Sequence, residues 1–138
     1  MKGSPTSASR PTPEAARPLV LAADDNVVTR RLISAMLGRE GYRVLTFADG
    51  EDLLTHAPDT TPTLIMLDIM MPKMDGHSTL CALRANRALA AVPILMLSSN
   101  NQEEDVVRCL KAGAADYMIK PFSPQELAAR VSKLIGRR

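Results

Sequence analysis

The chain has 138 residues, 46% of them hydrophobic, which suits one domain of ordinary size with a single core and leaves no room for a second. Its 17 basic and 15 acidic residues give a net charge of +2, and neither sign gathers into a block typical of a nucleic-acid or membrane surface. The apolar stretches are too short to cross a bilayer, and residues 1–18 lack the apolar centre of a signal peptide. We therefore expect a cytoplasmic protein that binds neither membrane nor nucleic acid directly.

The N-terminal segment differs in composition from the rest of the chain. Residues 1–18 hold four of the 10 prolines, together with serine, threonine, alanine and arginine. Such a segment cannot bury enough apolar surface to offset the entropy lost on ordering. We predict a flexible tail over residues 1–18 and a folded domain over residues 19–138. The two cysteines, Cys81 and Cys109, lack the spacing of a metal site or disulfide framework and are expected to be free, buried thiols.

Short apolar runs alternate with longer amphipathic segments from residue 19 onward, which is typical of βα units around a parallel sheet. Most runs have no polar alternation, as expected for strands that helices cover on both faces. The runs are LVLAA at 19–23, VLTF at 44–47, LIML at 64–67, ILML at 94–97 and YMI at 117–119. With right-handed crossovers, five strands and five helices in alternation predict an α/β fold with an open, doubly wound parallel sheet.

The helices between these strands have recognisable ends. We expect side chains that cap their N-termini at Asn26, Asp49, Asp75, Asn100 or Asn101, and Ser123. Glycines at 41 and 113 are expected to end the first and fourth helices. The buried face of the first helix is predicted to be Val28, Leu32, Ala35 and Met36, and that of the last Leu127, Val131, Leu134 and Ile135.

Polar residues follow four of the five predicted strands and should meet at the carboxyl edge of the sheet, where ligands bind in such folds. Each has an ordinary explanation as a cap, turn residue or exposed charge. Together, however, three carboxylates beside one lysine and one hydroxyl would be costly without a cation. Mg2+ fits such oxygen ligands, with phosphate oxygens completing its shell. The residues are Asp24 and Asp25, Asp68, Ser98 and Ser99, and Lys120.

Four segments in the same order make the comparison with a family specific. They are LAADDN at 21–26, LDIMMPKMDG at 67–76, MLSS at 96–99 and GAADYMIKPF at 113–122. Over residues 19–136 the chain resembles the response-regulator receiver domains of two-component signalling, in particular stand-alone chemotaxis-type members. The resemblance implies a flavodoxin-like strand order of 2-1-3-4-5, with helices on both faces, and a cis peptide bond between Lys120 and Pro121.

The resemblance also implies roles for individual residues. Asp68 would accept a phosphoryl group from a sensor histidine kinase or a phosphotransfer protein. Asp25, Asp68 and the backbone carbonyl of Met70 would bind Mg2+ directly, and Asp24 would bind it through water. Lys120, the Ser98 hydroxyl and the backbone N–H of Ser99 would contact the phosphoryl oxygens. Such a domain is not an enzyme in the ordinary sense, although it assists its own phosphorylation and dephosphorylation.

Ser98 and Tyr117 are the expected switch residues. Movement of the Ser98 hydroxyl toward a phosphoryl group would vacate space that Tyr117 could fill, changing the surface of the fourth helix, fifth strand and fifth helix. A downstream effector protein would read this surface, and the chain would be a monomer or a weak dimer through it.

Three other interpretations stay open at this stage. One is a binding module that keeps the fold but works independently of phosphorylation. Another is a phosphatase with an aspartyl nucleophile, which commonly needs an acid two residues further on, where this chain has Met70. The last is a receiver module cut from a hybrid kinase or a multidomain regulator.

Overall fold

A single parallel sheet organises the protein, whose computed structural model describes residues 17–136; most of the predicted tail therefore lies outside the described residues. The strand order is β2-β1-β3-β4-β5, and every pairing is parallel. The strands are β1 (Leu19–Ala23), β2 (Arg43–Phe47), β3 (Leu64–Asp68), β4 (Ile94–Ser98) and β5 (Asp116–Ile119). The predicted fold class and the flavodoxin-like strand order are confirmed.

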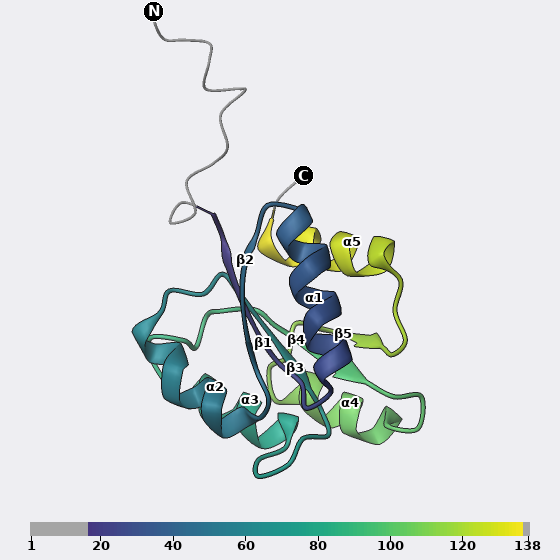
Figure 1. The fold of residues 1–138 in the computed structure, drawn as a ribbon. Coiled ribbons are helices and arrows are strands. Elements are labelled where there is room, and N and C mark those ends of the chain that lie inside the picture. Colours follow the sequence, from purple (N-terminus) through teal and green to yellow (C-terminus); the bar gives the residue numbers. More distant parts are fainter. Residues whose placement is uncertain (1–16, 137–138) are drawn as a thin grey trace, which may run out of the picture.

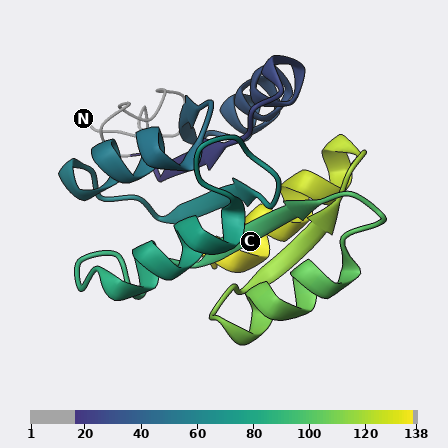
Figure 2. The same ribbon diagram turned by 90° about the horizontal axis from the view of Figure 1, so that it is seen from below.

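Helices cover both faces of this sheet, as Figures 1 and 2 show. On one face lie α1 (Val27–Arg39) and α5 (Pro124–Ile135); on the other lie α2 (Gly50–His56), α3 (Gly76–Ala85) and α4 (Glu103–Lys111), with a short 3-10 turn η3 (Ala57–Asp59) after α2. Alternate residues of β1 enter different cores: Leu21 packs on the side of α2 and α3, and Val20 on the side of α1 and α5. Because both faces are covered, the central strands are apolar except for the last residues of β3 and β4, Asp68 and Ser98. Within residues 17–136, no helix is long and apolar enough to span a membrane.

Four of the five predicted helix caps are present. Asn26, Asp49, Asp75 and Ser123 each accept hydrogen bonds from backbone N–H groups in the first turn of the following helix. The prediction for α4 is wrong, since its N-cap position is Gln102 rather than an asparagine, and its side chain makes no cap hydrogen bond to the helix. A turn at residues 100–101 precedes the helix instead. Gly41 and Gly113 follow α1 and α4 with φ of 94° and 115°, as expected for helix-ending glycines.

The predicted buried face of α1 is wrong for three of its four residues, and only Met36 packs against the core. Ile33 and Leu37 are fully buried, whereas Val28 is 68% exposed and Leu32 38% exposed. Two adjacent apolar stripes run along this helix one residue apart, so helical spacing alone could not decide which one faces the sheet. The prediction for α5 is confirmed, since Leu127 and Val131 are buried and the other two residues pack against the same core.

The two cysteines differ in burial. Both are free, but Cys81 is exposed on α3 and only Cys109 is buried, so half of the cysteine prediction is wrong. Burial raises the pKa of the Cys109 thiol to about 11, which keeps it protonated and unreactive at neutral pH. Cys81 follows the buried Leu80 by one position, which rotates it about 100° toward solvent.

Candidate functional site

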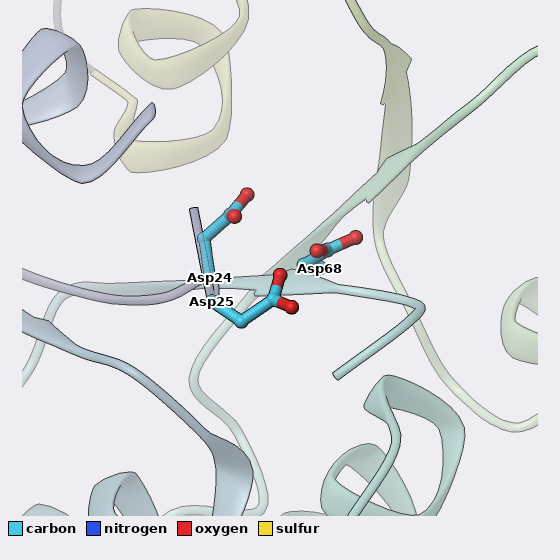
Figure 3. A group of neighbouring side chains, drawn as sticks. All are labelled: Asp24, Asp25 and Asp68. Atoms are coloured by element: carbon cyan, nitrogen blue, oxygen red, sulfur yellow. The ribbon is translucent and has the colours of Figure 1, made fainter. Parts of the chain in front are cut away.

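Three carboxylates meet where β1 and β3 end, at the point where the strand order reverses (Figure 3). One oxygen from each of Asp24, Asp25 and Asp68 lies within 4.8 Å of the others. Asp24 and Asp68 are buried, while Asp25 is exposed. The cluster is therefore an oxygen-only site that is enclosed by the sheet edge and reached from solvent past Asp25.

Lys120 points into the same cluster. Its Nζ lies 2.8 Å from Asp24 Oδ2 and 3.4 Å from Asp68 Oδ2. Its backbone N–H donates to the carbonyl of Ser98 at 2.7 Å, and the bond to Pro121 is cis, as predicted. Burial lowers the pKa of Lys120, but its hydrogen bond to Asp24 and the charges of both carboxylates outweigh burial and leave the pKa raised. The lysine therefore carries a full positive charge at neutral pH.

Asp68 sits in an environment that disfavours its ionised form. Burial, followed by the negative charge of Asp24, raises its pKa from 3.8 to about 6, although Lys120 and the N–H of Met70 oppose the change. The Met70 N–H donates to Asp68 Oδ1 at 3.3 Å. One lysine thus compensates incompletely for the carboxylates around it. A divalent cation would stabilise the ionised carboxylates much more strongly than the lysine does alone.

Three hydrogen bonds hold Asp24 in place. Its N–H donates to the carbonyl of Phe47 at 3.0 Å, its Oδ1 accepts from the N–H of Asn26 at 2.9 Å, and Arg30 Nη1 donates to its carbonyl at 2.8 Å. Asn26 also caps α1 through two hydrogen bonds. The acidic residue and the start of α1 are therefore held in one rigid unit. The contribution of Arg30 was not predicted, because an arginine on the polar side of a helix carries no sign of the carbonyl it contacts.

Ser98 and Ser99 end β4 beside this cluster and differ in their hydrogen bonding. The Oγ of Ser98 is buried and has no hydrogen-bond partner in the described chain. Buried hydroxyls without partners are uncommon and costly, which sets the Ser98 hydroxyl apart from the other polar groups of the site. The N–H of Ser99, expected to contact phosphate, instead donates to Gln102 Oε1 at 2.7 Å.

The remaining predicted residues lie on either side of the cluster. Met70 follows β3 and its side chain is exposed. Tyr117 on β5 is 36% exposed and lines a groove of about 270 Å³ between β5 and α4. Ser98 lines the same groove, together with Val106 and Leu110 of α4. The two predicted switch residues therefore share one groove.

Gly76 supports the site through its backbone, a role that sequence reasoning missed because it placed the residue only within a motif. A Cβ built on Gly76 would lie 2.4 Å from the carbonyl oxygen of Asp68 and 2.8 Å from the Cα of Ile69. Its N–H also donates to the carbonyl of Ile69 at 2.8 Å. Only glycine permits this approach of α3 to the backbone that carries Asp68.

Comparison with known protein families matches residues 20–132 to the response regulator receiver domain. The chain belongs to this family. Among solved structures, the receiver fold is shared with the chemotaxis protein CheY4 of Vibrio cholerae, at 33% identity and a TM-score of 0.82, over 86% of this chain and 99% of that one. The signal receiver domain of a histidine kinase from Syntrophus aciditrophicus has 28% identity and a TM-score of 0.80, over 86% of this chain and 90% of that one.

Two sequence relatives of this receiver domain are named as transcriptional regulators. The alkaline phosphatase synthesis transcriptional regulatory protein PhoP of Bacillus subtilis is 43% identical over 118 residues, covering 86% of this chain and 48% of PhoP. The transcriptional regulatory protein GltR of Pseudomonas aeruginosa is 38% identical over 118 residues, covering 86% of this chain and 49% of GltR. The chain spans about half the length of these curated relatives. The predicted family is confirmed, and the domain belongs to two-component signalling.

Proposed function

We propose that this receiver domain accepts a phosphoryl group on Asp68 from a phosphohistidine, in a Mg2+-dependent reaction, and passes the signal to an effector protein. The donor is a sensor histidine kinase or a phosphotransfer protein. One observation carries the proposal: the Asp68 carboxylate lies within 4.8 Å of Asp24 and Asp25 and 3.4 Å from the Lys120 ammonium. This geometry can hold both a cation and a phosphoryl group next to a carboxylate nucleophile.

The residues present suit Mg2+, because they offer hard oxygen ligands, excess negative charge and a solvent-open side where waters can stay bound. Asp25, Asp68 and the Met70 carbonyl would hold the ion directly, and Asp24 would hold it through water. When bound, Mg2+ supplies positive charge that offsets the phosphoryl oxygens. The pKa of Asp68 is about 6, so a proton competes with the metal for its carboxylate, and bound Mg2+ would displace that proton.

The chain's own side chains would then carry out the transfer. An Asp68 carboxylate oxygen attacks phosphorus, the phosphorus–nitrogen bond to the donor histidine breaks, and the released imidazole takes up a proton from water. Lys120 would exchange its contact with Asp68 for one with a phosphoryl oxygen, and the Ser98 hydroxyl would donate to another. Phosphoryl transfer depends mainly on such positioning and charge compensation.

Labelling by a small phosphodonor tests this proposal. We expect acetyl phosphate with Mg2+ to phosphorylate the full chain, as measured by mass spectrometry of rapidly quenched protein, and EDTA to prevent it. Asp68→Asn keeps the size of the side chain but removes the nucleophile, so its labelling should be lost. Asp59→Asn changes an exposed aspartate in η3 and serves as the matched control. Labelling of Asp68→Asn at the wild-type level would show that the assignment is wrong.

We further propose that Tyr117 turns into the β5–α4 groove when Asp68 is phosphorylated, after Ser98 has moved toward the phosphoryl group. Exposed apolar residues of α4 and β5 line this groove, where an effector could bind: Val107, Leu110 and Ile119. Inward rotation of Tyr117 would change the shape of this surface. A shift from a mostly inactive to a mostly active population needs about 5 kcal/mol of preference by the phosphoryl group.

Tyrosine fluorescence measures this movement directly. The chain has two tyrosines and no tryptophan. Because Tyr42 is only 5% exposed, acrylamide quenching reports mainly on Tyr117. We expect Mg2+ with beryllofluoride, a phosphoryl mimic, to reduce quenching, and Tyr117→Phe to abolish the response. Unchanged quenching in a sample that binds beryllofluoride would overturn the switch while leaving phosphorylation intact.

A further inference from the structure

The Gln102 side chain accepts a hydrogen bond from a backbone donor at the edge of the proposed phosphoryl site. Its Oε1 accepts from the N–H of Ser99 at 2.7 Å, the shortest hydrogen bond that this loop makes among those described. In return, the N–H of Gln102 donates to the carbonyl of Ser99 at 3.2 Å. Gln102 is only 9% exposed, so it is a built part of the loop rather than a surface side chain.

The three groups proposed to bind phosphoryl oxygens differ in their availability. The Ser98 Oγ is buried without a partner, and Lys120 is shared between Asp24 and Asp68. The N–H of Ser99 is already satisfied by a neutral amide oxygen. A backbone N–H has one proton, so it cannot serve the amide and a phosphoryl oxygen with equal geometry. A phosphoryl oxygen can therefore bind the Ser99 N–H only if the hydrogen bond from that N–H to the Gln102 side chain breaks.

Movement of Gln102 away from the Ser99 N–H would also affect the start of α4. The Gln102 carbonyl accepts from the N–H of Val106 at 3.0 Å, which is the first helical hydrogen bond of α4. Val106 lines the groove that also contains Ser98 and Tyr117. A change at Gln102 thus reaches the groove through this backbone hydrogen bond, without passing through the Ser98 hydroxyl.

We propose that Gln102 is a positioning residue that holds the β4–α4 loop in its resting state and must surrender the Ser99 N–H when a phosphoryl group binds. This inference rests on the proposed function. As a consequence, the strength of the hydrogen-bond acceptor at position 102 determines the affinity of the site for a phosphoryl group. A weaker acceptor favours the bound state, and a stronger acceptor opposes it.

Beryllofluoride affinity of the full chain, measured by calorimetry with Mg2+, tests this ranking. Gln102→Met keeps the length and burial of the side chain but has no oxygen acceptor, so we expect binding about fivefold tighter, the equivalent of one net hydrogen bond. Gln102→Glu supplies a stronger, charged acceptor and should bind more weakly. A merely structural role would weaken both variants. Gln125→Met, which changes an exposed glutamine of α5, should bind like the wild type.

The wild-type protein provides a second readout that needs no variant. Nuclear magnetic resonance should detect a scalar coupling across the hydrogen bond between the Ser99 N–H and the Gln102 side-chain carbonyl. We expect that coupling to vanish when Mg2+ and beryllofluoride are added. If the wild type binds beryllofluoride but keeps the coupling, or if Gln102→Met binds no more tightly, the inference is wrong and the phosphorylation proposal stands. If the wild type binds no beryllofluoride at all, both are wrong.

Discussion

Replacement of Asp68 by asparagine is expected to raise the free energy of unfolding by about 2–3 kcal/mol at about pH 7.5 without divalent cations. The reason is the pKa of Asp68, which burial and Asp24 raise from 3.8 to about 6. Between these two values the folded state binds more protons than the unfolded state, so ionisation of Asp68 lowers stability as the pH rises. Above about pH 6 Asp68 is mostly ionised in the folded protein, so nearly the full loss of stability is present. Asparagine does not ionise and avoids this loss.

Urea unfolding followed by circular dichroism checks this expectation. The gain should be smaller at about pH 5, where Asp68 is largely protonated in the folded protein, and should vanish below about pH 4. Mg2+ should stabilise the wild type more than the variant, because the carboxylate is one of the proposed ligands. The exposed control Asp59→Asn should change stability by less than about 0.5 kcal/mol. A variant less stable than the wild type at neutral pH would contradict the assigned environment of Asp68.

Gly76→Ala is expected to lower the free energy of unfolding by about 3 kcal/mol, an effect at the upper end for overpacking. The added methyl would meet the Asp68 carbonyl oxygen at 2.4 Å and the Ile69 Cα at 2.8 Å, and both are backbone atoms that cannot rotate away. Either α3 or the end of β3 has to shift. Phosphorylation of Asp68 should therefore fall along with stability, because the nucleophile moves with its backbone.

Gly38→Ala provides the matched control for this substitution. Gly38 lies in α1, and a Cβ added there meets nothing within 4 Å. Alanine is the better helix former, so this variant should be more stable by about 0.5–1 kcal/mol. Denaturant unfolding of both variants separates the general effect of glycine replacement from contact with the Asp68 backbone. Equal effects of the two substitutions would show that the close approach of α3 is unimportant.

The strength of the sequence prediction varied with the kind of signal. Helix starts at Asn26, Asp49, Asp75 and Ser123 were predictable because the capping hydrogen bond is local. The start of α4 was not, although residues 99–102 read Ser-Asn-Asn-Gln and contain the Ser-x-x-Gln spacing of a capping box. That spacing could have revealed the contact between Gln102 and the N–H of Ser99. The two asparagines between them were equally good candidates for the cap, but in the folded loop α4 has no side-chain cap at its N-cap position, and Gln102 binds the Ser99 N–H instead.

Burial on α1 shows a different limit. The sequence predicts an amphipathic helix there, and the structure contains one. However, Ile33 and Leu37 face the sheet, while Val28 and Leu32 remain exposed. The stripes differ by a single rotation of about 100°, and packing against α5 and the sheet selects between them. Cys81, which is exposed where burial was predicted, follows the same rule on α3.

By itself, the sequence determined the alternation of strands and helices, the parallel sheet and the side chains that end β1, β3, β4 and β5, because these follow from local patterns and from the geometry of βα units. The tertiary structure decided the distances among Asp24, Asp25, Asp68 and Lys120, the raised pKa of Asp68 and the engagement of the Ser99 N–H by Gln102. These properties depend on burial and on contacts between residues far apart in the chain. Local sequence patterns contain no information on burial or on distant contacts, since both arise only when the strands align in the sheet.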